Sequence, residues 1–102
     1  MPINFTKAIV GQLQREIADL DNQAGVLKQK QHKAQAKIKQ LQRDMKLSQS
    51  SSDLSSKLSR VNKHNEEIKT ATRALADLAK QITAKKTALE QHLSKAARRE
   101  ES

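Results

Sequence analysis

From Ile3 onward, apolar residues recur at alternating steps of four and three, which is the spacing of the contact stripe, or seam, of a coiled coil. A second stripe with the same spacing runs from Leu54 to Ala96. The two stripes are in phase. If the chain folds back between them, residues whose numbers add to 99 face each other, from Met45 opposite Leu54 to Ile3 opposite Ala96. The sequence therefore predicts an all-α fold, an antiparallel two-helix coiled-coil hairpin.

On the second helix, the predicted seam combines the row that begins at Leu54 with a companion row that begins at Leu58 and includes Asn65 and Lys86. The polar positions of the predicted seam are Gln31 on the first helix and Asn65 on the second. Such positions commonly fix register or partner number at some cost in stability. The apolar residues predicted to form the seam are Ile3, Val10, Leu13, Ile17, Leu20, Leu27, Ile38, Leu41, Met45, Leu54, Leu58, Val61, Ile68, Leu75, Ile82, Leu89 and Leu93.

The stretch MKLSQSSSDLSSKL interrupts the stripes with six serines in nine positions. Serine and aspartate compete for backbone hydrogen bonds, so they weaken helix interiors and favour caps. We expect a first helix over about 3–47, a turn over about 48–53 and a second helix over about 54–99, with Ser50 and Asp53 as a capping pair and Ser51 and Ser52 as competing caps. The alternative is one continuous helix of about 100 residues in a parallel dimer, and the serines argue against it. Phosphorylation of the serines is a weaker interpretation, because a turn needs such residues anyway.

A two-helix hairpin leaves one side of its seam uncovered, and this chain is only 35% hydrophobic with one aromatic residue, Phe5. Ala71 and Leu78 widen the stripe of the second helix, and the first helix carries a line of small residues spaced by seven, Gly11, Ala18 and Gly25. Small side chains let another backbone approach closely. These five residues are the candidate self-association face of a homodimeric four-helix bundle. The alternative is a monomer on which they are ordinary surface residues.

The net charge of +9 is concentrated around the predicted turn. Residues 28–63 carry ten basic residues against Asp44 and Asp53, a net charge of +8. Such a basic tip suits an acidic protein or the phosphates of a nucleic acid, although lysine is also common on solvated coiled coils. The near absence of aromatic residues disfavours readers of single strands. The candidate patch consists of Lys28, Lys30, Lys33, Lys37, Lys39, Arg43, Lys46, Lys57, Arg60 and Lys63.

No catalytic, cofactor-binding or metal-binding constellation is predicted, so we do not expect this chain to be an enzyme. Cysteine is absent, the three histidines do not converge with carboxylates, and Glu66 and Glu67 are neighbours that face apart on a helix. No apolar run is longer than three residues, the length of Ala8-Ile9-Val10, which is far short of the roughly 20 residues of a membrane span. With no signal peptide either, we expect a cytoplasmic protein.

The Ser-rich turn SQSSSDLSSKLSRVNKH and the following helix LADLAKQITAKKTALEQHL, after a first heptad helix, resemble the N-terminal coiled-coil region of bacterial TIR-domain proteins. This resemblance rests on layout and composition over nearly the whole chain. It implies that the helices promote self-association and that a downstream TIR domain, which would carry the NAD-cleaving activity, follows the hairpin.

We therefore expect an oligomerisation or scaffold module that brings TIR domains together. Two alternatives stay open at this point: a small basic helical protein that binds nucleic acid, and an adaptor or chaperone for an acidic protein partner.

Overall fold

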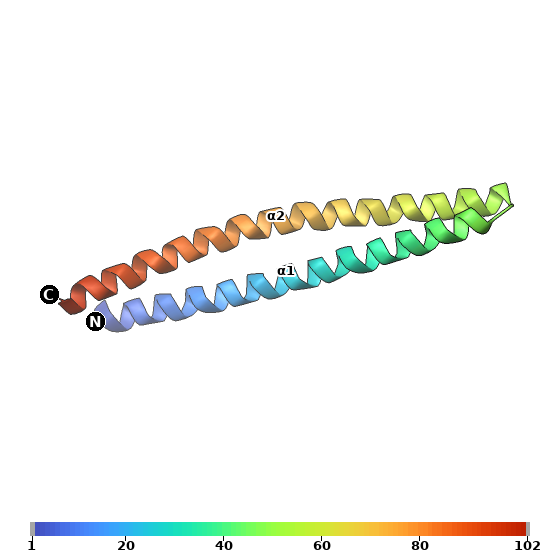
Figure 1. The fold of residues 1–102 in the computed structure, drawn as a ribbon. Helices are drawn as coiled ribbons and strands as arrows, with labels where there is room; N and C mark the ends of the chain where they lie inside the picture. The colour runs from blue at the N-terminus through green and yellow to red at the C-terminus, as the bar shows by residue number, and fades with distance from the viewer. Residues whose placement is uncertain (1, 102) are drawn as a thin grey trace. The chain divides into compact units, whose positions relative to one another are not determined.

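The protein consists of two antiparallel α-helices in a computed structural model that describes residues 2–101, and the side chains of 5–96. Helix α1 covers Pro2–Leu47 and helix α2 covers Ser51–Glu101 (Figure 1). Residues 48–50 join them, and the described part of the chain contains no strand. The predicted all-α helical hairpin is confirmed. Gly25, the only glycine besides Gly11, has no positive φ, so neither helix is broken at a glycine.

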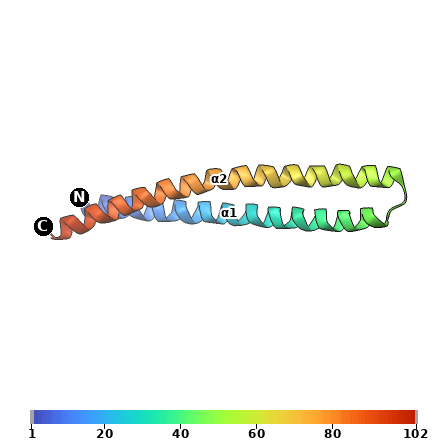
Figure 2. The ribbon, with the colours of Figure 1, turned by 45° about the horizontal axis from the view of Figure 1, so that its top comes forward.

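Each helix contributes one segment to each of two compact units. Unit 1 contains Met1–Ala24 and Asp77–Ser102, and unit 2 contains Gly25–Ala76 with the turn. In both units a segment of α1 packs against a segment of α2, and a second view shows the turn that joins them in unit 2 (Figure 2). Each unit is therefore a pair of helices with a single seam.

The turn is shorter than the predicted one because α2 begins at Ser51 rather than near residue 54. Ser50 is the cap of α2: its hydroxyl oxygen accepts a hydrogen bond from the Asp53 amide at 3.3 Å, and its carbonyl accepts the first helical bond from the Leu54 amide at 3.0 Å. The Ser48 amide in turn donates to the Met45 carbonyl at 3.3 Å, which closes the end of α1. Of the three predicted cap candidates, the structure selects Ser50, so Ser51 and Ser52 form the first turn of α2.

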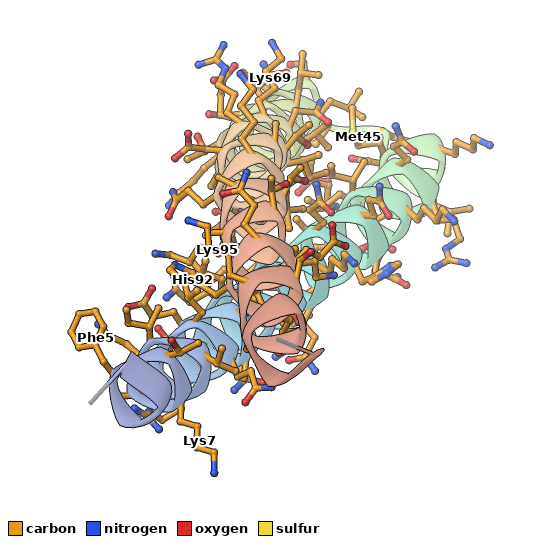
Figure 3. The ribbon with its side chains drawn as sticks, turned by 90° about the vertical axis from the view of Figure 1, so that its left-hand side faces the viewer. Phe5, Lys7, Met45, Lys69, His92 and Lys95 are labelled. Carbon is orange, nitrogen blue, oxygen red and sulfur yellow. The ribbon has the colours of Figure 1, made fainter. Side chains whose placement is uncertain are left out.

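The α1 side of the seam follows the predicted rows. Leu20 and Ala34 are buried, and the other described seam positions are half-buried. Met45 points from α1 toward α2 near the turn (Figure 3). The half-buried residues predicted for this side are Val10, Leu13, Ile17, Leu27, Ile38, Leu41 and Met45, whereas the side chain of Ile3 lies outside the described ones.

On α2, one predicted row lies in the seam, whereas the other contacts α1 through the hydroxyl of Thr72 but leaves its large apolar residues exposed. Val61 is buried, and Leu54, Ile68, Leu75, Ile82 and Leu89 are half-buried, as expected of the first row. The predicted companion row is wrong, because Leu58 is 51% exposed and Leu93 is 48% exposed. The polar positions Asn65 and Lys86, predicted for the same row, are exposed as well.

In the structure, the row that lies beside the row of Leu54 to Ala96 is one residue earlier in the sequence than the predicted companion row. It consists of Lys57, His64, Ala71, Leu78, Lys85 and His92, all of them buried or half-buried. This row places Leu78 in the seam where the other row offers only Ala79, and Lys57 and Lys85 pack their aliphatic stems while their ammonium groups reach carboxylates. Ala71 and Leu78 are therefore seam residues, and their predicted place on a self-association face is corrected.

The facing residues also differ from the predicted layers. Across unit 2, the Gln31 side-chain amide donates a 2.9 Å hydrogen bond to the Thr72 hydroxyl. Across unit 1, the Lys85 ammonium group lies 2.5 Å from a Glu16 carboxylate oxygen. The residue numbers of these pairs add to 103 and 101 rather than to 99. The helices thus meet two to four residues away from the predicted register, which follows from the change of companion row.

The cap of α2 can be tested by Ser50→Ala. Loss of the hydroxyl removes the side-chain acceptor of the Asp53 amide, so we expect the free energy of unfolding to fall by about 1 kcal/mol. Urea denaturation followed by circular dichroism measures it. Ser52→Ala is the matched control, because Ser52 lies inside the first turn of α2; an equal loss in both variants would show that Ser50 is not the cap.

Candidate interaction surfaces

A groove lies between α1 and α2 in unit 2. Its volume is about 610 Å³, and its apolar floor consists of Leu27, Ala34, Ala71 and Ala74. Ala34 is 2% exposed and Ala71 is 5% exposed, so these two methyl groups lie at the contact between the helices. The groove exists because alanines occupy seam positions at which larger residues would fill the space.

The rim of this groove is rich in cations. Lys30, Lys33 and Lys37 line it from α1, and Lys63 lines it from α2. All four are exposed, and none takes part in an ion pair or hydrogen bond within the described residues. These lysines are free to interact with a partner.

Two carboxylates lie on the same rim, and both already have a neighbour on α2. A Glu66 oxygen lies 3.5 Å from the Lys69 ammonium group, which extends into solvent (Figure 3). A Glu67 oxygen lies 3.3 Å from Nδ1 of His64. Because these acids interact with neighbours on their own helix, they only partly offset the charge of the three lysines on the opposite wall.

The predicted basic patch falls entirely within unit 2. Nine of its ten residues are exposed: Lys28, Lys30, Lys33, Lys37, Lys39, Arg43, Lys46, Arg60 and Lys63. Lys57 is the exception, because its side chain is half-buried and its ammonium group lies 2.6 Å from Asp53. This ion pair and a hydrogen bond from Ser48 lower the pKa of Asp53 below its usual range. Lys57 thus supports the beginning of α2 rather than a binding surface.

A polar layer lies in unit 1, where Glu16 faces Lys85. The Glu16 carboxylate accepts hydrogen bonds from Lys85 and, at 3.0 Å, from the Gln12 side-chain amide. The Lys85 ammonium group holds the pKa of Glu16 below its usual range, and Gln12 adds to this effect. Both side chains of the pair are about one-third exposed, so solvent screens the pair in part. Spacing along one helix does not reveal this pair, because its partners come from different helices.

The line of small residues on α1 has unequal environments. Gly11 is half-buried, and a Cβ atom there would lie 3.5 Å from a guanidinium nitrogen of Arg15. Ala18 and Gly25 are exposed, and a Cβ atom on Gly25 would meet nothing within 4 Å. Within the hairpin itself, nothing requires a glycine at position 25.

Both units leave large apolar side chains exposed. Phe5 projects from α1 on the side away from α2 (Figure 3). On α2, Leu58 and Leu93 belong to the row that the seam leaves out, as does the exposed Ala79. The most exposed large apolar residues are Phe5 at 69%, Val26 at 53%, Leu47 at 84%, Leu58 at 51% and Leu93 at 48%.

Metal sites and membrane spans are two further kinds of feature that the described residues do not form. Among the described residues, no group of three or more histidine, aspartate or glutamate side chains is arranged to hold a metal ion. Neither helix contains, within those residues, an apolar stretch of the length that a membrane span requires.

Comparison of the chain with protein-family models, with curated proteins and with solved structures found no match in any of the three.

The pair of Glu16 and Lys85 predicts a pH dependence. A carboxyl group whose pKa is lowered on folding stabilises the fold above its unfolded-state pKa, and this contribution is lost as the pH falls through the folded-state pKa. We therefore expect the free energy of unfolding to decrease as the pH falls below the usual glutamate value of 4.5, and to decrease less in Glu16→Gln. Urea titrations at a series of pH values measure this. Glu90→Gln, at an exposed glutamate without an ion pair, should follow the wild-type curve; if it instead matches Glu16→Gln, the pair is not responsible.

The open space at position 25 predicts that Gly25→Ala stabilises α1. Alanine is favoured over glycine in a helix interior by about 1 kcal/mol, and the new methyl group meets no described atom within 4 Å. Urea denaturation at low protein concentration should show this gain. The same substitution at Gly11, where the methyl group meets Arg15, should give a smaller gain. A loss of stability in Gly25→Ala would mean that another molecule packs against this position.

Proposed function

We propose that this chain is an oligomerisation and interaction module whose hairpins pair into a dimeric four-helix bundle. The observation that carries the proposal is the incomplete burial of its apolar residues. No side chain among residues 5–96 is completely buried, while large apolar side chains on both helices stay about half exposed or more. A second hairpin would cover such residues and complete a core that two helices cannot build alone.

The amount of exposed surface supports the same proposal. The chain exposes 7885 Å², whereas a compact monomer of 11.4 kDa exposes about 5800 Å². The excess arises because each residue of a two-helix unit has only one neighbouring helix. Pairing of two hairpins gives each helix a second adjacent neighbour and encloses a shared core, which is the arrangement that stabilises four-helix bundles.

The side of α2 that we assign to self-association is the row left out of the seam. Leu58 in unit 2, and Ala79 and Leu93 in unit 1, are separated by multiples of seven residues and so have the same heptad position beside the seam of their own unit. In unit 1 this face adjoins a shallow depression of about 400 Å³, lined by Ala79, Lys80, Thr83 and Ala84. Small side chains here allow close approach of a second copy.

The TIR setting is a further part of the proposal and rests on the resemblance of the turn and second helix alone. In that setting, paired hairpins would bring TIR domains together, and the hairpin itself would carry no catalysis. The sequence of the gene beyond the codon for Ser102 tests this part. An α/β domain encoded there supports it, and a stop codon contradicts it without affecting the proposal of self-association.

Self-association can be tested by sedimentation equilibrium. We expect the wild-type chain to have the mass of a dimer at concentrations on the order of 10 to 100 µM. The double variant Leu58→Gln/Leu93→Gln should raise the dissociation constant at least about tenfold, because it places amides in an apolar contact.

Leu47→Gln is the matched control, since Leu47 is the most exposed large apolar residue and lies on α1, outside the proposed row. It should leave the dissociation constant nearly unchanged. A monomeric wild-type chain would contradict self-association altogether, and equal effects of the two variants would contradict the assignment of this row.

A further inference from the structure

The groove in unit 2 has the features of a site for a third helix. Its floor is apolar and made of small side chains, with Ala34 and Ala71 buried and Ala74 half-buried. Small residues on both walls let an incoming helix reach the 8–10 Å interaxial distance of packed helices. We infer that this groove binds an amphipathic α-helix of a partner protein whose apolar stripe faces the alanines and whose flanks carry carboxylates.

The length of the groove suits such a partner. On α1 its lining runs from Leu27 to Lys37, and on α2 from Lys63 to Ala74. Each segment is about 15 Å long at 1.5 Å per residue, which corresponds to about three helical turns. An amphipathic helix presents two or three apolar anchors over this length, which is the usual extent of helix-in-groove recognition.

The charge of the rim specifies acidic flanks. Lys30, Lys33 and Lys37 line one wall without an ion pair among the described residues, and Lys63 lies on the other. Glu66 and Glu67 already interact with Lys69 and His64. A partner with glutamates beside its apolar stripe would pair with the free lysines, whereas a basic partner would be repelled.

A second copy of this chain does not fit the groove in a symmetric manner. Symmetric pairing through this face would bring eight lysines from the two copies together, with only Glu66 and Glu67 of each copy to offset their charge. The row that we assign to self-association is also elsewhere on α2. Leu58 adjoins the seam row of Leu54 and Val61, whereas Ala74 adjoins the row of Ala71 and Leu78, on the other flank of the seam. This inference therefore does not depend on self-association.

A nucleic acid would contact only the charged rim of this groove and not its apolar floor. Phosphates would pair with the lysines, but they would leave the apolar floor of Leu27 and the alanines exposed to water. A helix with an apolar stripe covers the floor and neutralises the rim at once. The geometry thus favours a protein helix, and binding of duplex DNA becomes an outcome of the test.

The test uses the full chain and a labelled synthetic peptide of about 20 residues, with leucines on one helical stripe and glutamates on both flanks. Fluorescence anisotropy at low salt measures its binding. We expect saturable binding that weakens as salt is added, and a loss of affinity of about tenfold or more in Lys33→Glu/Lys37→Glu. Lys28→Glu/Lys39→Glu makes the same change of charge on the same helix outside the groove lining, and it should weaken binding far less.

Two further measurements separate the groove from net charge. Ala74→Trp keeps every charge but fills the floor, and it should also lower the affinity about tenfold. A peptide with lysines in place of the glutamates should bind Lys33→Glu/Lys37→Glu more tightly than the wild-type chain. Circular dichroism of each variant checks that the helices are intact.

Equal losses in the two charge-reversal pairs would overturn the inference, because binding would then follow net charge alone. Unchanged affinity in Ala74→Trp, combined with tight binding of duplex DNA that the same lysine substitutions abolish, would overturn it in favour of phosphate recognition. Failure of the wild-type chain to bind the peptide at low salt would overturn it as well. None of these results bears on the dimer mass, so failure here and failure of self-association can be told apart.

Discussion

Contact between the row from Leu54 to Ala96 and the stripe of α1 is the interaction on which the rest of this structure depends. Each helix has only one neighbour, so this single stripe must supply nearly all of the apolar burial that opposes the loss of chain entropy. It does so with few fully enclosed groups: Leu20, Ala34, Val61, Ala71 and Leu78 are the buried apolar residues among those described. The grooves, exposed leucines and half-buried lysines all arise because each helix packs against only one other helix within the chain.

Much of the fold could be predicted from the sequence because its signals are local and periodic. The steps of four and three give the helices and the α1 side of the seam, and the serines give the turn. The cap also follows from local chemistry, although choosing Ser50 over Ser51 and Ser52 required the three-dimensional path of the chain. These features need no knowledge of what lies opposite each residue.

The companion row of α2 could not be predicted in the same way. Two rows of period seven adjoin the row of Leu54. The row that begins at Leu58 and ends at Leu93 has apolar residues at both ends, whereas the other row has Lys57 and His92 there, so hydrophobicity alone favours the row of Leu58. The row that begins at Lys57 lies in the seam instead, because Leu78 fills the seam in unit 1 and because the ammonium groups of Lys57 and Lys85 reach carboxylates. The charge of the basic patch was likewise visible in the sequence, whereas the groove was not, since it depends on which alanines meet across the two helices.

The short turn also governs the order in which such a hairpin can assemble. Pairing Gln31 with Thr72 closes a loop of 41 residues, and pairing Glu16 with Lys85 closes a much longer one, whereas contacts beside Ser48–Ser50 close loops of only a few residues. The entropy lost on closing a loop grows with its length, by about 0.6 kcal/mol for each doubling. Contact between the helices is therefore least costly at the turn, and each layer formed there shortens the free chain that the next layer must close. We therefore expect the two helices to pair first beside the capped serine turn.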